Sequence, residues 1–288
     1  MAMTSVRGAT AVITGGGSGI GRATAVSLAN RGARVVVADI HADNANAVAD
    51  QIRAEGHEAE AFVCDVGTDR AFGALKAFTM ERFGGVDIVM NNVGVLTSGR
   101  PDHLPIAEWE RIININLMSV VRSNATFLPI LIAQGHGHIV NTASFAGLYT
   151  YSYDRIPYAA TKAAIVQISE GLRLYLHPQG IGVTVLCPGP VATNILATMP
   201  ERFGPEVQTG LPGPQFGILL PDTVGEMVAN AILDDTFMLY TDDQVRDLLI
   251  ERATDWDAFI AKQTDTLSGG GGGQLTSPRQ DPATSSDS

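Results

Sequence analysis

The sequence contains very little cysteine. Cys64 and Cys187 are the two cysteines in 288 residues, and each lies inside an apolar run. Neither belongs to a CxxC pair or to a spacing that metal ligands use. Two isolated cysteines of this kind are typical of buried thiols rather than of a disulfide framework or a zinc site. The sequence therefore predicts no metal site and a reducing compartment, which we expect to be the cytoplasm.

Basic clusters and long apolar stretches are missing as well. The formal net charge is -11, from 19 Lys and Arg against 30 Asp and Glu. An acidic chain without a basic patch argues against a nucleic-acid surface, and solubility alone accounts for the charge. No apolar run approaches the ~18 residues of a membrane span, and the first ten residues contain no apolar signal segment. These absences predict a soluble protein that binds neither nucleic acid nor membrane.

What the chain does contain is a regular alternation of β-rich runs and helical patterns. Strands are expected at 9–14, 34–38, 59–64, 86–90, 138–142, 182–187 and 237–240, and helices at 20–30, 43–55, 68–83, 106–134, 157–176, 222–233 and 244–261. Strands that alternate with helices pair in parallel. The sequence therefore predicts an α/β fold of Rossmann type, a doubly wound, mainly parallel seven-stranded sheet with helices on both faces. We expect one domain over residues 1–267.

Two segments depart from this alternation. Residues 188–221 hold half of the chain's 14 prolines, and a connection so long is typical of a lid, which we place at 190–221. Residues 268–288 are rich in glycine and serine and cannot bury a core, so a disordered tail is expected there. The helices at 106–134 and 157–176 carry more apolar surface than one sheet face can cover. This excess predicts a homo-oligomer, a dimer or a tetramer.

A glycine-rich turn, TGGGSGIG at 14–21, follows the first strand and opens the first helix. Glycine lets the backbone turn sharply, and it lets a phosphate approach the helix N-terminus. The turn is not a Walker loop, because no Gly-Lys-Ser/Thr follows. The glycines expected to contact the phosphates are Gly15, Gly19 and Gly21.

Asp39 ends the second strand, 18 residues beyond Gly21. A carboxylate there can accept hydrogen bonds from both adenosine ribose hydroxyls, and it repels a 2′-phosphate. Ser18 and Ile40 supply no cation for such a phosphate. The sequence therefore favours NAD over NADP, although Asp39 could instead be a helix N-cap. Asp65, after the third strand, either meets the adenine edge or caps the following turn.

Tyr158 and Lys162 are four residues apart in a segment expected to be helical, so their side chains share one face. A cation held beside a phenol favours the phenolate and lowers the phenol's pKa. Such a pair can act as a general base, even though a free phenol has a pKa of about 10. Ser144 precedes the pair in the same stretch.

Together these motifs resemble the short-chain dehydrogenase/reductase family, in its NAD-preferring, single-domain branch. The resemblance runs from about residue 10 to residue 240 and rests on motifs in the family's order: TGGGSGIG, Asp65-Val66, NNVG at 91–94, Ser144 with YAATK at 158–162, and Pro188-Gly189 with Thr193. Two departures stand out. Val93 replaces the family's alanine, and Ser144 and Tyr158 are 14 residues apart, one more than the family pattern. We expect the extra residue to bulge in the loop at 149–156.

The resemblance implies a role for each matched residue. Tyr158 would be the base in oxidation and the acid in reduction, while Lys162 would bind the nicotinamide ribose and lower the pKa of Tyr158. Ser144 would stabilise charge on the substrate oxygen. Asn116 would hold a proton-relay water and is preferred to Asn114. The other cofactor contacts implied are Ser18, Ile20, Asp65, Val66, Asn92, Gly94, Pro188, Gly189, Val191 and Thr193.

Side chains expected around the substrate are mostly apolar or aromatic: Leu96, Phe145, Tyr151 and Tyr153. They predict a hydrophobic or aromatic secondary alcohol or ketone, interconverted by hydride transfer with NAD, unless they pack only among themselves. Two other functions stay open, a non-catalytic NAD-binding regulator and a sugar-nucleotide epimerase or dehydratase. The intact Ser144, Tyr158 and Lys162 set argues against the first. The short C-terminal part and the glycine spacing argue against the second.

Overall fold

The computed structural model describes residues 3–199, 202–207 and 210–268 of the chain. Seven strands form one sheet in which neighbouring strands run parallel, in the order β3-β2-β1-β4-β5-β6-β7. The strands are β1 (Thr10–Thr14), β2 (Arg34–Asp39), β3 (Ala59–Val63), β4 (Ile88–Asn91), β5 (Gly137–Thr142), β6 (Ile181–Cys187) and β7 (Met238–Tyr240). The strand order reverses between β1 and β4, which creates a crevice beyond their carboxyl ends. The predicted doubly wound fold of Rossmann type is confirmed.

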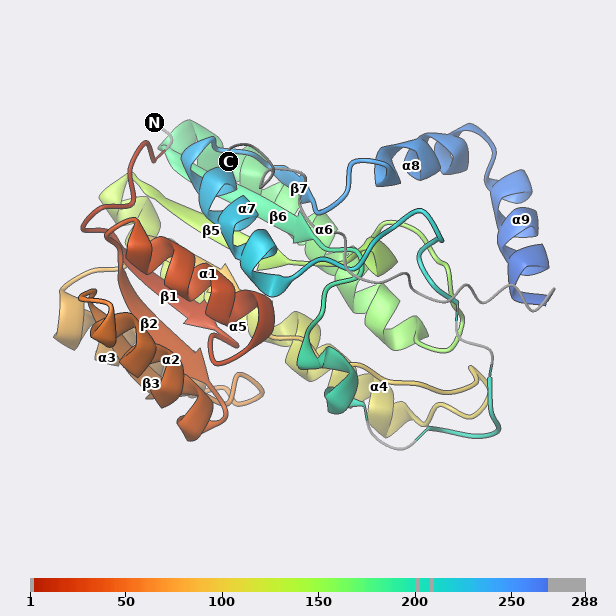
Figure 1. Ribbon diagram of the computed structural model, residues 1–288, viewed down its shortest axis with the longest axis horizontal. Coiled ribbons are helices and arrows are strands. Elements are labelled where there is room, and N and C mark those ends of the chain that lie inside the picture. The colour runs from red at the N-terminus through yellow and green to blue at the C-terminus, as the bar shows by residue number, and fades with distance from the viewer. Residues whose placement is uncertain (1–2, 200–201, 208–209, 269–288) are drawn as a thin grey trace, which may run out of the picture.

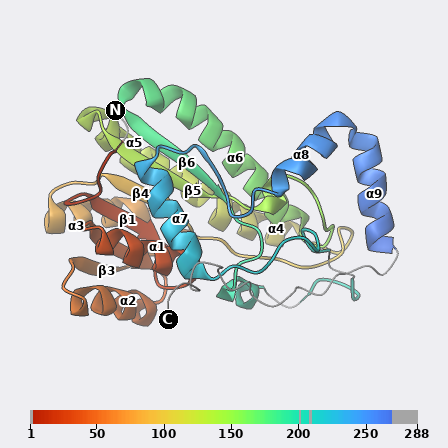
Figure 2. The ribbon, with the colours of Figure 1, turned by 45° about the horizontal axis from the view of Figure 1, so that its top comes forward.

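Helices cover both faces of this sheet, as Figures 1 and 2 show. One face carries α1 (Gly19–Asn30), α2 (Ala42–Ala54) and α7 (Pro221–Leu233), and the other carries α3 (Ala71–Phe83), α5 (Ser119–Gln134) and α6 (Ile156–Leu176). Successive side chains of a strand point to opposite faces. In β1, Ala11 and Ile13 therefore pack in the core beneath α1, and Val12 packs in the core beneath α3 and α5.

The predicted helix at 106–134 is continuous but contains a change of pitch. It consists of α4 (Ile106–Ile112), a π-helical turn η1 (Ile113–Met118) and α5. By length and mean hydropathy this helix could cross a membrane, although 39% of its most apolar window is buried inside the domain. It contacts α3, β4 and β5 and buries polar side chains, including Asn116, Ser123 and Asn124. These contacts are those of a helix that belongs to the core of a globular domain.

Two of the predicted helix boundaries are wrong. Thr68 does not cap the third helix, which begins at Ala71. Instead the Thr68 N–H and hydroxyl both donate to the Asp65 carbonyl, so these residues form a turn. The helix expected at 244–261 is two helices, α8 (Val245–Thr254) and α9 (Trp256–Ser268). Asp255 between them is extended, and its carboxylate accepts from the Ala258 N–H at 2.9 Å, which starts a new helix.

Helices α8 and α9 form an arm that projects from the body of the molecule in both views (Figures 1 and 2). Phe259 of α9 is buried, and its ring meets the Tyr149 ring edge-on at 6.2 Å between centroids. The arm therefore rests on the loop that follows β5. Residues 269–288, which hold nearly all of the predicted tail, lie outside the described residues.

His138 of β5 gives the fold a pH-dependent stability that can be measured. Its imidazole is completely buried, and its Nε2 lies 2.8 Å from the Thr184 hydroxyl. Burial lowers the pKa of His138 from 6.5 to about 4; the charge of Asp235 opposes this shift and that of Arg173 adds to it. The neutral ring therefore stabilises the native state fully above pH 6.5, and this contribution is lost as the pH falls toward 4.

We expect wild-type protein to lose roughly 3 kcal/mol more unfolding free energy across this pH window than a His138→Gln variant. Urea denaturation at several pH values measures both curves, and the exposed His41 gives the matched control His41→Gln. Parallel curves for wild type and His138→Gln would show that His138 does not carry this pH dependence.

Candidate active site

The glycine-rich turn lies at the crevice where the strand order reverses. Gly19 has a left-handed φ of +52°, which favours glycine over other residues. A Cβ on Gly21 would stand 2.1 Å from the Gly15 carbonyl oxygen. The tight turn from β1 into α1 therefore requires glycine at both positions.

The N-terminus of α1 offers unused donors to this crevice. Ser18 is the N-cap but makes no side-chain capping bond, and the first turn holds no acidic residue. Among the described residues, the backbone N–H groups of Gly19, Ile20 and Gly21 have no acceptor. A helix N-terminus with free N–H groups favours an anion. The turn therefore fits the pyrophosphate of a dinucleotide.

Asp39 lies across from this turn, at the end of β2. Its Oδ2 accepts from the Gly17 N–H and its Oδ1 from the His41 N–H, each at 3.0 Å. The N-cap of α2 is His41, so the alternative reading of Asp39 as the cap is wrong. Each carboxylate oxygen has further lone pairs after these bonds, and they fit ribose hydroxyls.

Asp65 and Val66 behave differently from Asp39. The Asp65 side chain is exposed and accepts from the Gly67 N–H at 3.0 Å, so it caps the turn that follows β3. Val66 is buried in the core with Phe72. Two exposed apolar side chains lie at the same carboxyl end of the sheet as Asp65. Ile40 follows β2 and is 55% exposed, and Val63 ends β3 and is 58% exposed. Their apolar surface fits one face of a planar base such as adenine.

Asn92 connects the turn to the centre of the sheet. Its N–H donates to the Thr14 hydroxyl, its amide NH2 donates to the Gly15 carbonyl, and its amide oxygen accepts from the Thr142 hydroxyl. Val93, the departure from the family pattern, has a methyl 3.3 Å from where a Cβ on Gly15 would stand. Its side chain also packs against the core beneath α3 and α5. The extra methyl groups are therefore accommodated beside the turn.

Ser144, Tyr158 and Lys162 converge at the carboxyl end of β5. Helix α6 places Tyr158 and Lys162 one turn apart, with Nζ 5.7 Å from the phenol ring centroid. Lys162 donates from Nζ to the Thr142 carbonyl at 2.7 Å, and Nζ also lies against Gly94. The Ser144 hydroxyl lies close enough to the Tyr158 phenol to act on its pKa. The additional residue between Ser144 and Tyr158 therefore does not separate their hydroxyls.

The electrostatics of this group differ from the expectation. Burial raises the pKa of Tyr158 above its usual 10, while the nearby Ser144 hydroxyl and the charge of Arg155 act in the opposite direction. Burial lowers the pKa of Lys162 from 10.5 to about 8. Burial therefore outweighs the positive charge beside Tyr158, and Arg155, a residue that the sequence motifs did not mark, is a nearby cation that acts to lower its pKa. The role of Lys162 in lowering the pKa of Tyr158 stays a prediction.

Arg155 is held in place by its neighbour Asp154. The Asp154 carboxylate accepts from Arg155 Nε at 2.9 Å and from the Ser152 hydroxyl at 2.5 Å, and it is 1% exposed. Asp154 also accepts through its backbone carbonyl from the Gly99 N–H at 2.8 Å. The loop with the additional residue is thus anchored from within, and it presents the guanidinium to the tyrosines of the site.

Asn116 and Asn114 lie in the π-helical turn η1 but serve different segments. The buried Asn116 amide forms two bonds with the Val95 backbone, accepting from its N–H at 2.8 Å and donating to its carbonyl at 3.0 Å. Asn114 donates to the Gly67 carbonyl and accepts from Arg122. The structure therefore brings Asn116, and not Asn114, to the segment beside the catalytic candidates.

The loop after β6 returns to the glycine turn. The Gly189 N–H donates to the Thr241 hydroxyl at 2.8 Å, and Val191 pairs with Leu219 in an isolated parallel bridge. Thr193 lies against Gly19, where a Cβ would be 3.1 Å from its methyl carbon. Thr193 is the N-cap of η4 (Asn194–Thr198), and Pro188 accepts from the Phe145 N–H through its carbonyl. The predicted lid region thus begins over the N-terminus of α1.

The predicted substrate residues separate into two groups. Leu96 and Tyr151 pack with Tyr158 in a small apolar cluster that also contains Ala146, Ile195 and Met199. Phe145 is completely buried in the core, with its ring against Gly189 and Phe216, so it supports the loop after β6 from beneath. Tyr153 is 38% exposed. Sequence reasoning missed Ile195 and Met199, whose signal was apolar character just after Thr193.

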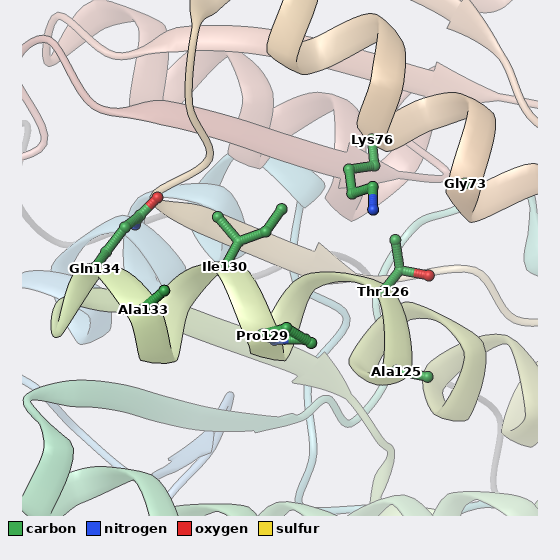
Figure 3. Close-up of a pocket in the computed structure, with 8 residues that line it drawn as sticks. All are labelled: Gly73, Lys76, Ala125, Thr126, Pro129, Ile130, Ala133 and Gln134. Carbon is green, nitrogen blue, oxygen red and sulfur yellow. The ribbon is translucent and has the colours of Figure 1, made fainter.

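A separate hollow of about 630 Å³ lies between α3 and α5 (Figure 3). It is lined by Gly73, Lys76, Ala125, Thr126, Pro129, Ile130, Ala133 and Gln134. None of these residues belongs to the candidate site, and the stretch from Ala125 to Gln134 is the outer part of α5. The hollow is therefore a feature of the helix surface, remote from the reactive groups.

The chain is similar to known proteins over most of its length. The family model for short chain dehydrogenases matches residues 9–202. An uncharacterized oxidoreductase of Listeria monocytogenes, Lmo0432, is 34% identical over 223 residues, which are 77% of this chain and 89% of the relative. The (2S)-[(R)-hydroxy(phenyl)methyl]succinyl-CoA dehydrogenase subunit BbsD of Thauera aromatica is 34% identical, covering 67% of this chain and 77% of the relative. A short-chain dehydrogenase/reductase of Burkholderia phymatum in complex with NAD has a TM-score of 0.80 at 30% identity, covering 89% and 96% of the two chains.

Proposed function

The chain belongs to the short-chain dehydrogenase/reductase family of oxidoreductases, and from this premise we propose that it interconverts a secondary alcohol and a ketone by hydride transfer with NAD. The observation that carries the proposal is the convergence of Ser144, Tyr158 and Lys162 beside the glycine turn. A phenol, a hydroxyl and an ammonium group in one buried site form an acid–base system without a metal ligand set.

NAD fits the residues that line the crevice. The N–H groups at the start of α1 would hold the pyrophosphate, Asp39 the adenosine ribose, and Lys162, which has two N–H donors beyond its bond to Thr142, the nicotinamide ribose. When bound, the nicotinamide supplies the hydride acceptor for oxidation and, in reduced form, the hydride donor for reduction. The charge of Asp39, with no basic residue beside it at Ser18 or Ile40, supports NAD rather than NADP.

The protein's own part in the reaction is proton transfer and orientation. In oxidation the Tyr158 phenolate accepts the proton of the alcohol O–H, while the C–H bond breaks as hydride and the C=O bond forms. Ser144 donates a hydrogen bond to the same oxygen and fixes it beside Tyr158. Asn116 positions the neighbouring segment through its two bonds with Val95. In reduction Tyr158 returns the proton as the acid.

Apolar surroundings of the phenol support a hydrophobic or aromatic substrate. Tyr158, Leu96 and Tyr151 are in one cluster with the lid residues Ile195 and Met199. The name of the relative BbsD describes a substrate with a hydroxy(phenyl)methyl group, which is a secondary benzylic alcohol. Both observations favour a small benzylic alcohol or ketone as the first probe.

Self-association and a cytoplasmic location complete the proposal. The two long helices expose large apolar side chains, among them Ile106 at 73%, Leu174 at 81% and Tyr175 at 60%. Burial of this surface against a second copy would be favourable. Light scattering at micromolar concentration tests it, and a monomer would rule it out.

A screen of secondary alcohols tests the function. The panel runs from 2-butanol and small polyols to 1-phenylethanol, with NAD and then NADP, followed by the absorbance of the reduced cofactor. We expect the highest kcat/KM for 1-phenylethanol with NAD. Turnover of polyols alone would contradict the hydrophobic substrate, and no cofactor reduction with any alcohol would contradict the dehydrogenase function and favour a regulator or an epimerase.

Arg155 gives a further test through the pH dependence of the reaction. Its positive charge favours the Tyr158 phenolate, so replacing it by glutamine should raise the pKa of Tyr158 further. Oxidation uses the phenolate as base, and its rate rises with pH through this pKa. We therefore expect the alkaline rise of kcat/KM for 1-phenylethanol oxidation to move to higher pH in Arg155→Gln. The charge-retaining variant Arg155→Lys is the control, and superimposable profiles for wild type and Arg155→Gln would be the contrary result.

A further inference from the structure

The segment 95–96, which follows β4, carries one of the side chains that surround the reactive phenol. Leu96 is 4% exposed, and its side chain packs in one apolar cluster with Tyr158 and Ala146. The segment is neither helix nor strand, so its backbone polar groups need partners outside regular secondary structure. Each N–H and each carbonyl of the two residues has such a partner, and every partner is a side chain.

Two side chains of the continuous helix α4–η1 hold the segment from one side. The Asn116 amide forms its two bonds with the Val95 backbone. Arg111 donates from Nη2 to the Leu96 carbonyl at 2.8 Å. Residues five apart on an α-helix point about 140° away from each other, which would direct these two side chains to different faces. The π-helical turn η1, whose hydrogen bonds link residues five apart, reduces this angle, so both side chains reach the same segment.

Arg111 is itself fixed by a buried carboxylate. Glu108, one turn earlier on α4, is 5% exposed and accepts from Arg111 Nε and Nη2 at 2.8 Å each. A buried carboxylate requires a partner of this kind, and the planar guanidinium meets it with two parallel N–H groups. The second hydrogen on Nη2 points away from this pair and is donated to the Leu96 carbonyl. Glu108 therefore orients Arg111, and Arg111 determines where the Leu96 carbonyl lies.

The remaining bond of the segment comes from the predicted lid. The Leu96 N–H donates to the Thr198 hydroxyl at 3.0 Å, and this hydroxyl donates to the Ile195 carbonyl at 2.6 Å. Both lid residues belong to η4, and Ile195 packs in the same apolar cluster as Leu96. Helix α4 and the lid are therefore joined through Leu96, next to Tyr158.

We propose that Arg111 is a positioning residue that sets substrate specificity: it holds the Leu96 carbonyl so that the Leu96 side chain forms a fixed apolar wall for a bulky substrate group beside Tyr158. The inference rests on the proposed function, because the wall is defined relative to the alcohol or ketone that Tyr158 binds. Arg111 is bound to Glu108 and Leu96 and does not touch the substrate. A wall that is already ordered loses less conformational entropy when a flat aromatic group packs on it. A small alkyl group contacts the wall less and gains less from its order.

Arg111→Lys tests this role and keeps the charge that pairs with Glu108. An ammonium group cannot reproduce both the planar pair of bonds to Glu108 and the third bond to Leu96. We expect KM for 1-phenylethanol at saturating NAD to rise about fivefold, the equilibrium equivalent of one net hydrogen bond, with kcat within about twofold of wild type. KM for 2-butanol should change by less than about twofold. An equal rise for both alcohols, or no rise for either, would overturn the inference.

Arg100→Lys is the matched control. Arg100 forms the same pair of bonds, from Nε and Nη2 to the Asp102 carboxylate, but its side chain is 45% exposed and lies outside the segment 95–96. It should leave both KM values unchanged. Urea denaturation checks that Arg111→Lys is folded under the assay conditions. If it is not, the double variant Glu108→Gln/Arg111→Gln, which removes both charges together, should give the same rise for 1-phenylethanol alone.

Amide hydrogen exchange of the cofactor-free protein tests the positioning without turnover. In Arg111→Lys, peptides covering 94–100 should exchange about fivefold faster than in wild type, and peptides from β1 and β2 should not change. Unchanged exchange at 94–100 would overturn the inference. If wild type oxidises no alcohol in the panel, the proposed function fails, while the exchange experiment still decides whether Arg111 holds the segment.

Discussion

Replacing Tyr158 by phenylalanine should lower kcat for alcohol oxidation by about 10³-fold or more, with NAD affinity within threefold of wild type. The variant keeps the ring in its apolar cluster and removes only the hydroxyl beside Ser144. No other group can take over as base, because Lys162 is directed to the Thr142 carbonyl and Ser144 has no neutral-pH basicity. Steady-state kinetics with 1-phenylethanol and calorimetric titration with NAD measure the two quantities.

Tyr175→Phe is the control for this substitution, since Tyr175 lies on the same helix but is 60% exposed. It should leave kcat unchanged. If Tyr158→Phe retained more than a tenth of wild-type kcat with the same pH profile, the base would have to be another group and the mechanism would be wrong.

Removing the charge of Asp39 should remove most of the discrimination against NADP. We expect wild type to prefer NAD by about 10²- to 10³-fold in kcat/KM, because a carboxylate close to a 2′-phosphate raises the binding free energy by several kcal/mol. Asp39→Asn keeps the size of the side chain and an acceptor for the Gly17 or His41 N–H. The ratio of kcat/KM values for NAD and NADP should fall to within about tenfold of unity in this variant.

Asp43→Asn provides the matched control, because Asp43 is an exposed carboxylate in the first turn of α2. It changes the net charge by the same amount and should leave the cofactor ratio near the wild-type value. A wild-type enzyme that uses NADP as well as NAD, or an unchanged ratio in Asp39→Asn, would contradict the role given to this carboxylate.

The sheet and the cofactor crevice were predictable because their causes are local in sequence. Strands buried on both faces appear as short apolar runs such as 34–38, and the glycine at 21 is demanded by a backbone contact six residues away at Gly15. The helical spacing of Tyr158 and Lys162 likewise fixes their shared face. For these features, the residues that form the sequence pattern are the same residues whose contacts produce the structure.

Features that depend on tertiary contacts were not predictable. The pKa of Tyr158 depends on burial, on Ser144 and on Arg155, whose orientation depends on the buried Asp154. The bond from the Gly210 N–H to the Ser152 hydroxyl depends on how the lid segment folds over residues 149–152. The break at Asp255 depends on a cap bond to Ala258 that competes with helix continuation. Spacing alone carries no information about these contacts.

The role of Tyr158 and the preference for NAD both presuppose hydride transfer from the substrate carbon to the cofactor. The most direct test uses 1-phenylethanol deuterated at the carbinol carbon, with mass spectrometry of the cofactor and the ketone after a single turnover. We expect one deuterium in the reduced nicotinamide for each acetophenone formed, and none in the ketone. Product formed without deuterium in the cofactor, or label returned to the alcohol carbon with no ketone, would contradict the dehydrogenase reaction.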